Sequence, residues 1–303
     1  MTTPTGEQYE LRSGPYRAVV VQIGGGLRAL TYGGREVLDG YHADQSVEGG
    51  RGQLLAPWPN RIDHGRYRFG GKDHQLELTE PARDNAIHGL VRREPWRLVE
   101  HGTASATLAH ELRESPGYPY AVDFRVDYSL HADTGLTVRM TAANVGDVVA
   151  PYGFGAHPYL TVGTRSIDHC ELVLPAAVRM LTDERGLPAG REPVSGTSWD
   201  FRTHRQIGAT RLDDPYTDLT RDDGGQARAV LRDPKSGAAS TLWLDRSCRW
   251  VQVYTGDTLP SRQREGLAVE PMTCPPNAFV SGEDLVVVQP SAKHTTTWGV
   301  SAS

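Results

Sequence analysis

One carboxylate at the end of an apolar run is the residue in this sequence best suited to acid–base chemistry. Residues 266–269 predict a buried strand that ends in Glu270, and Pro271, Pro275 and Pro276 follow closely. We expect these prolines to stop the strand, because proline fixes φ and removes a backbone donor. Partial desolvation at the mouth of such a strand raises the pKa of a carboxyl toward the range useful to a general base. Glu270 is therefore a candidate catalytic residue; the alternative is a salt-bridged or helix-capping glutamate.

Two histidines stand in settings typical of side chains that face a cleft. His88 lies between an apolar pair and a glycine, and Pro158 holds His157 in an extended backbone. Taken singly, each is more often a hydrogen-bonded structural histidine. Together with Glu270 they allow a two-histidine, one-carboxylate metal site. They also allow acid–base chemistry in which a histidine and a glutamate serve opposite ends of a proton relay.

The elements that must position these residues are predicted to be β-strands, because apolar and polar residues alternate with period two. Residues 122–130 alternate in this way, Asp133-Thr134-Gly135 makes a turn, and residues 136–142 resume the alternation, which indicates a hairpin. No amphipathic helix of three turns stands out. We predict an all-β, antiparallel, sandwich-like fold with one domain over residues 1–303. Further hairpins are expected at residues 29–38 and 67–78, and further strands at 172–174, 239–244, 250–254 and 285–288.

One glycine-rich segment matches a dinucleotide-binding pattern by composition alone. An apolar run at residues 18–23 precedes Gly-Gly-Gly-Leu-Arg-Ala at 24–29. That motif needs a helix whose N-terminus binds pyrophosphate, and the glycines at 33 and 34 leave no room for one. We therefore exclude a dinucleotide site.

Composition excludes several classes of protein. The net charge of −5 is spread over mixed signs without a Lys/Arg block, which argues against a nucleic-acid surface. No apolar run approaches the ~20 residues that span a bilayer, and the N-terminus lacks the layout of a signal peptide. Three widely spaced cysteines fit neither a disulfide framework nor a zinc ribbon. We expect a soluble cytoplasmic protein, monomeric or weakly dimeric, that binds a small molecule and neither nucleic acid nor membrane.

Several sequence blocks resemble the aldose 1-epimerase (galactose mutarotase) family in order and spacing. The resemblance covers most of the chain, and the blocks around His157 and Glu270 are the most specific. The blocks are Asn60-Arg61-Ile62, residues 65–71, Ala86-Ile87-His88-Gly89, Gly117-Tyr118-Pro119, residues 155–159 and residues 270–279.

The resemblance implies a large antiparallel β-sandwich, often called a supersandwich, with a sugar cleft on one sheet and neither metal nor organic cofactor. By position, Glu270 resembles the family's general base and His157 its general acid. If both serve one pyranose, the two groups should face each other across roughly 4–7 Å.

The resemblance also implies a set of residues that bind the sugar. His88 resembles the second active-site histidine, and Arg61, preceded by Asn60, the arginine that contacts substrate. Asp213 resembles the sugar-binding aspartate, although the neighbouring Asp214 is an alternative and a solvated turn carboxylate is the simpler reading.

One departure from the family pattern bears on the substrate. After His88 the chain reads Gly-Leu-Val-Arg-Arg, where the best-studied galactose mutarotases have a second glycine. Arg92 and Arg93 could meet an anionic sugar, as expected of mutarotases for sulfoquinovose or of hexose-6-phosphate 1-epimerases, or could simply be solvated. A non-catalytic carbohydrate-binding domain and a metal-dependent sugar isomerase or lyase are the other readings.

Overall fold

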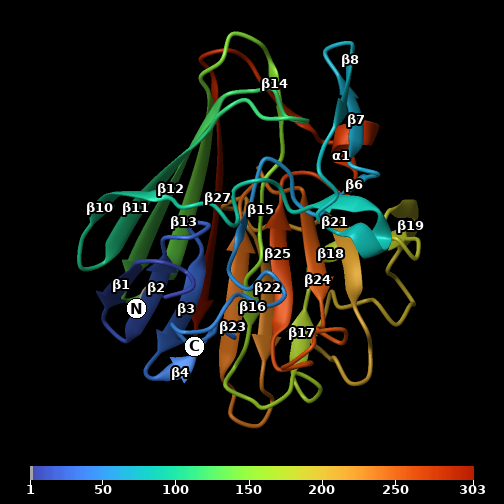
Figure 1. Ribbon diagram of the computed structural model, residues 1–303. Coiled ribbons are helices and arrows are strands. Elements are labelled where there is room, and N and C mark those ends of the chain that lie inside the picture. The colour runs from blue at the N-terminus through green and yellow to red at the C-terminus, as the bar shows by residue number, and fades with distance from the viewer. Residues whose placement is uncertain (1–2) are drawn as a thin grey trace.

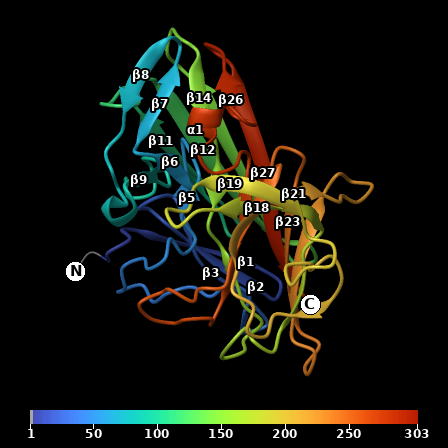
Figure 2. The same ribbon diagram turned by 90° about the vertical axis from the view of Figure 1, so that its right-hand side faces the viewer.

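The computed structural model describes residues 3–303 and consists almost entirely of β-strands (Figures 1 and 2). Two large antiparallel sheets hold most of the strands. Regular helix in the described residues is limited to α1 (Ala278–Ser281) and the 3₁₀ turn η1 (Pro81–Arg83). The prediction of an all-β, antiparallel sandwich is confirmed.

No helix within residues 3–303 is long and apolar enough to cross a membrane.

The larger sheet has nine strands and contains the predicted hairpin of residues 122–142. Its order is β10-β11-β12-β13-β27-β23-β22-β17-β20, so the last strand of the chain pairs with β13 and β23. Their bounds are β10 Arg97–His101, β11 Ser105–Leu112, β12 Val122–His131, β13 Gly135–Asn144, β27 Lys293–Ala302, β23 Ala239–Leu244, β22 Ala227–Arg232, β17 Glu171–Val173 and β20 Arg205–Gln206.

The second sheet has eight strands in the order β19-β18-β21-β24-β25-β15-β5, with β16 also paired to β25. This sheet carries the C-terminal motif, and its strands β21, β24 and β25 lie side by side in Figure 1. The bounds are β19 Pro188–Pro193, β18 Ala176–Thr182, β21 Asp213–Leu219, β24 Trp250–Tyr254, β25 Leu267–Met272, β15 Gly155–Ala156, β5 Leu54–Leu55 and β16 Tyr159–Leu160.

Smaller sheets complete the molecule. The hairpin β7–β8, helix α1 and the pair β14–β26 gather at one end, the top in both Figure 1 and Figure 2. The four-stranded sheet is β1 Gln8–Ser13, β2 Tyr16–Val21, β3 Leu27–Tyr32 and β4 Arg35–Glu36; the pairs are β14 Ala150–Tyr152 with β26 Val286–Val288, β6 Arg61–Asp63 with β9 Asn85–Ile87, and β7 Arg66–Phe69 with β8 Lys72–Gln75.

The alternation in the sequence is reproduced as alternating burial. Along β12 every second side chain is buried, and β13 repeats the pattern in register with it. Gly135, at the turn, has φ +80°, and a Cβ there would lie 2.4 Å from the carbonyl oxygen of Val300, so only glycine fits. The hairpins predicted at residues 29–38 and 67–78 are also present, as β3–β4 and β7–β8.

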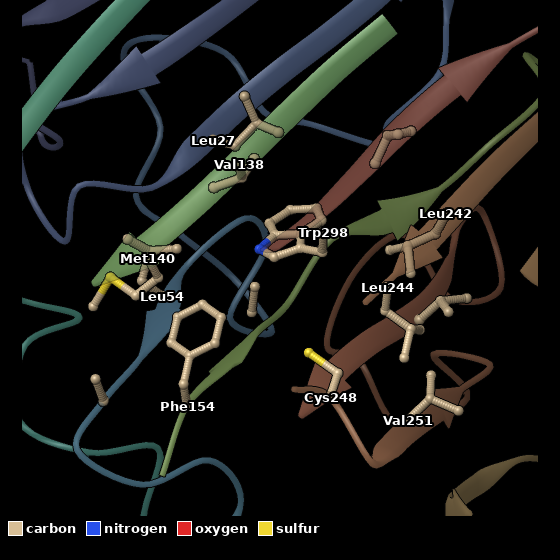
Figure 3. Close-up of a cluster of buried hydrophobic side chains, with 14 of the residues drawn as sticks. Leu27, Leu54, Val138, Met140, Phe154, Leu242, Leu244, Cys248, Val251 and Trp298 are labelled. Carbon is tan, nitrogen blue, oxygen red and sulfur yellow. The ribbon is translucent and has the colours of Figure 1, made fainter. Parts of the chain in front are cut away.

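The buried faces of the two large sheets meet in one apolar core. Figure 3 shows part of it, where Trp298 of β27 lies among Met140, Phe154 and Leu244, which come from three other strands or loops. These side chains are buried, with at most 2% exposure. The core fixes the positions of β24 and β25, whose other faces are free to carry polar groups.

One sequence-based prediction about β25 is wrong. Pro271 does not end the strand, which continues to Met272. The amides of Val269 and Thr273, on either side, donate to the carbonyls of Pro158 and Phe154. The pairing of β25 with this neighbouring chain is interrupted between Gly155, opposite Met272, and Tyr159, opposite Ala268, so the donor that Pro271 lacks falls in a gap of the ladder.

Candidate active site

The outward face of the eight-stranded sheet carries a row of polar side chains. Val251, Val253 and Val269 point into the core. Because side chains alternate along a strand, Gln252 and Glu270 point outward, and they face each other across the β24–β25 pair.

Asp213 belongs to the same row. It stands opposite Tyr254 at the start of β21, and its Oδ1 accepts a hydrogen bond of 2.8 Å from Gln252 Nε2. Asp214 instead pairs with Arg179 at 3.1 Å. The structure therefore places Asp213, and not Asp214, in the row that contains Glu270.

His157 lies at the break between β15 and β16, level with Glu270 in the register set by Gly155 opposite Met272 and Tyr159 opposite Ala268. Its N–H donates to the carbonyl of Gln53 at 3.0 Å, and its carbonyl accepts from the N–H of Gly52 at 2.9 Å. These bonds continue the pairing of β15 with the chain before β5 and fix the backbone of His157 beside the strand that carries Glu270.

His157 and Glu270 are in direct contact. Nε2 of the imidazole lies 3.4 Å from Oε1 of the carboxyl, and the two side chains are 7% and 3% exposed. Glu270 Oε2 and His157 Nδ1 have no hydrogen-bond partner in residues 3–303. The two groups are thus slightly closer than the roughly 4–7 Å expected of groups that serve one pyranose, and within an ångström of that range.

His88 joins the pair from a tight turn after β9. Its ring meets that of His157 edge to face, with centroids 5.6 Å apart. His88 itself has φ +63°, and its Nδ1 accepts a bond of 3.2 Å from the backbone N–H of Asn60. That bond makes Nδ1 the unprotonated nitrogen and leaves Nε2 as the donor.

Arg61 enters the cleft with a carboxylate partner that the sequence did not reveal. Arg61 Nε and Nη2 donate to the carboxylate of Glu80 at 2.7 and 3.0 Å. This bidentate ion pair fixes the guanidinium plane. Asn60 accepts from Arg61 Nη1 at 3.4 Å and donates to Gln252 at 3.4 Å. A continuous polar network therefore joins Glu80 to Asp213.

All six predicted site residues line one cleft of about 450 Å³. Sequence reasoning missed Gln252 and Glu80, which line it too. The sequence could have indicated Gln252, because it is the polar residue within the apolar strand Trp-Val-Gln-Val-Tyr. No sequence feature singles out Glu80. The predicted residues are Asn60, Arg61, His88, His157, Asp213 and Glu270.

Burial changes the proton affinities of the central pair. It raises the pKa of Glu270 well above the usual value, and the charge of Asp213 adds to this. Burial lowers the pKa of His157 to about 3, with the arginines Arg92 and Arg51 contributing in the same direction. Both shifts favour the uncharged forms of the two groups, a protonated carboxyl and a neutral imidazole.

The metal reading finds no support from ligand geometry. Within residues 3–303 no group of three or more His, Cys, Asp or Glu side chains is arranged to hold a metal ion. His88, His157 and Glu270 do lie close together. However, Nδ1 of His88 accepts a hydrogen bond from a backbone amide, so Nε2 carries the proton and is not available as a metal ligand.

A larger hollow of about 560 Å³ lies near Trp250, on the same sheet. Its walls carry ion pairs that neutralise each other, Arg191 with Glu283 and Arg249 with Asp284. The smaller cleft instead contains His157 Nδ1 and Glu270 Oε2, two buried polar atoms that have no hydrogen-bond partner among residues 3–303. We therefore assign the candidate site to the smaller cleft.

The comparison with known proteins agrees with this geometry. A sequence model of the aldose 1-epimerase family matches residues 7–301. The chain belongs to the aldose 1-epimerase family. The resemblance seen in the sequence blocks is thereby confirmed.

Several known proteins are similar to this chain over nearly its full length. YihR of Escherichia coli, which is uncharacterized, is 38% identical over 290 residues, 96% of this chain and 91% of YihR. The galactose mutarotase of Mus musculus is 24% identical, with 97% of this chain and 93% of the mouse protein covered. The crystal structure of a GalM/aldose epimerase homologue from C. elegans has a TM-score of 0.87 at 18% identity, with 98% of each chain covered. That structural likeness shows the fold.

Proposed function

We propose that the protein is an aldose 1-epimerase that interconverts the α and β anomers of a hexose. The observation that carries the proposal is the buried contact between His157 Nε2 and Glu270 Oε1 in this cleft. Each side chain keeps one further polar atom that has no hydrogen-bond partner among residues 3–303. Mutarotation needs two groups that can each take and give a proton, and a binding domain needs neither.

In the proposed reaction, Glu270 removes the proton of the C1 hydroxyl while His157 delivers a proton to the ring oxygen. The ring opens, the C1–C2 bond rotates, and closure from the other face gives the opposite anomer. Because burial favours a protonated Glu270 and a neutral His157, a proton must first pass from the carboxyl to the imidazole across the 3.4 Å contact. The pair then returns to its starting state, since each step reverses at ring closure.

The remaining polar residues of the cleft would hold the sugar. Asp213 and Gln252 present an acceptor and an amide on the floor, and His88 presents Nε2–H beside His157. Arg61, fixed by Glu80, supplies N–H donors toward the oxygen on which charge develops as the ring opens.

A second candidate substrate is an anionic sugar, such as sulfoquinovose or a hexose 6-phosphate. Arg83, Arg92 and Arg93 line the cleft, and Arg92 contacts Gln53 at 3.4 Å without a carboxylate partner in residues 3–303. Burial, followed by the charge of Arg93, lowers the pKa of Arg92 to about 10. A buried cation without a carboxylate partner loses solvation energy, and an anionic group on a ligand would compensate for that loss.

Polarimetry of fresh α-glucose and α-galactose solutions tests the proposed function. We expect the rate of anomer exchange to rise in proportion to protein concentration and to persist after chelator treatment. Sugar binding without acceleration would identify a carbohydrate-binding domain. Activity lost to a chelator and restored by a divalent metal would identify the metal-dependent alternative.

The ratio of kcat/KM for an anionic and a neutral hexose decides between the two substrate classes. For a neutral-sugar enzyme we expect the 6-phosphate or 6-sulfonate to be at least tenfold worse than glucose, because its charge must be desolvated. For an anion-specific enzyme the order reverses, and Arg92→Gln removes the preference. Lys72→Gln, at an exposed residue of β8, is the matched control.

We further propose that residues 1–303 form one domain, and that the protein acts in the cytoplasm as a monomer or weak dimer. These remain predictions from the sequence.

A further inference from the structure

A buried ion pair lies beside the cleft and has no part in the reaction proposed above. Arg51 donates through Nε and Nη2 to Asp39 Oδ2, at 3.1 and 3.0 Å, and both side chains are 2% exposed. Taking two charges out of water offsets most of their attraction, so such a pair adds little stability. Arg51 does not line the cleft itself.

The guanidinium of Arg51 reaches His157 through one aromatic ring. It lies over Tyr159, 4.6 Å from the ring centroid. Tyr159 in turn stacks on His157 with centroids 5.0 Å apart and ring planes 8° from parallel. The tyrosine hydroxyl is fixed as well, because it donates to the carbonyl of Gly49 at 2.8 Å.

The loop that carries Arg51 also encloses His157. A Cβ at Gly50, which has φ +73°, would lie 2.8 Å from Cδ2 of the imidazole, so the backbone packs directly against the ring. Gly52 and Gln53 make the two backbone hydrogen bonds that fix the main chain of His157. Arg51 stands in the middle of this loop, and its bond to Asp39 therefore anchors both the loop and Tyr159.

We propose that Arg51 is a positioning residue for His157. Anchored by Asp39, it fixes the plane of Tyr159, and that ring fixes the imidazole whose Nε2 faces Glu270. The inference rests on the proposed function, in which the imidazole must reach the ring oxygen from one orientation. A displacement of about 1 Å at such a group can cost roughly 100-fold in rate.

The charge of Arg51 acts in the same direction. Burial is the main cause of the low pKa of His157, and Arg92 and Arg51 add to it. Loss of the Arg51 cation should therefore raise that pKa. The titratable and charged groups that face or act on the imidazole are Glu270, His88, Tyr159, Arg51 and Arg92.

Arg262 offers a matched control. It donates to the other oxygen of Asp39, and it also pairs with Glu265 at 2.9 Å. Within residues 3–303 its partners are Asp39, Gly40 and Glu265, and it contacts neither Tyr159 nor His157 by a hydrogen bond, an ion pair or ring stacking. Arg51→Gln and Arg262→Gln each remove one cation from Asp39 and leave the other, so Asp39 keeps a partner in both variants.

The test compares these two variants and Arg51→Lys by kinetics and by ¹⁵N NMR of histidine. We expect Arg51→Gln to lower kcat about 10- to 100-fold with KM changed less than about threefold. The ring ¹⁵N shifts and pKa of His157 should move in this variant. Arg262→Gln should leave kcat and KM within about twofold of wild type and the His157 ring shifts unchanged. Arg51→Lys, which keeps the cation, should retain more of kcat than Arg51→Gln does.

Equal losses of kcat in Arg51→Gln and Arg262→Gln, tracking their melting temperatures, would show that the ion pair only stabilises the fold. Unchanged His157 shifts in folded Arg51→Gln would also overturn the inference. If the wild-type protein does not accelerate anomer exchange, the proposed function fails, but the NMR comparison still decides whether Arg51 positions the imidazole.

Discussion

Replacing Glu270 by glutamine is expected to lower kcat for anomer exchange by about 10²–10⁴, the usual contribution of a general acid–base group. Glutamine keeps the shape and can still hydrogen-bond to His157, which lies 3.4 Å away in the wild-type protein. It cannot take or release a proton at neutral pH, so the pair loses the single proton that moves. Two-dimensional exchange NMR between the anomeric protons measures the rate directly.

The same substitution should stabilise the folded protein at neutral pH. Because burial raises the pKa of Glu270, the native state keeps a proton that the unfolded chain releases above pH ~4.5. In this range the unfolded state holds fewer protons than the native state. The free energy of unfolding of the wild-type protein therefore falls as the pH rises from ~4.5 to the pKa of Glu270 in the native state. Glutamine does not ionise, so the advantage of Glu270→Gln in melting temperature should grow over this window.

Glu114→Gln, at an exposed position, is the control for both measurements and should change neither. A Glu270→Gln variant that retains more than about a tenth of wild-type kcat would remove this residue from the proton-transfer role. A melting temperature that falls at pH 8 but not at pH 4.5 would show that the carboxylate is the stable form in the native cleft.

The sequence predicts the hairpins well because their information is local. In β12 and β13 each residue's face follows from its own polarity and from a turn at Gly135. Pro271 could not be placed in the same way. Its effect depends on a gap in the pairing of β25 with the chain around His157, and that segment is bonded to a loop more than 100 residues earlier in the sequence.

The same difference between local and long-range information applies to the residues of the candidate site. His157 and Glu270 were found because short, unusual motifs surround them, and the structure brings them into contact. Glu80 and the pair of Arg51 with Asp39 carry no local signal, since charged residues are common on loops. Their burial and their partners come from distant segments, so only the folded structure distinguishes them from solvated side chains.

The double variant of His157→Asn and Glu270→Gln should be far from additive. We expect His157→Asn alone to lower kcat by about 10²–10⁴, because asparagine keeps a polar side chain but cannot carry the proton. Once either member is lost, the remaining one has no partner with which to exchange the proton. The double variant should therefore fall within a few-fold of the slower single variant.

The pH profile gives an independent check on this coupling. Burial lowers the pKa of His157 to about 3, so wild-type kcat/KM should show no inflection near pH 6.5, where an ordinary histidine titrates. It should decline only on the alkaline side, as the raised pKa of Glu270 is passed and the pair loses its shared proton. His42→Asn, at an exposed histidine, should change neither rate nor profile. Additive losses in the double variant, or an acidic limb near pH 6.5, would mean that the two residues act separately and that His157 gives its proton as a free imidazolium.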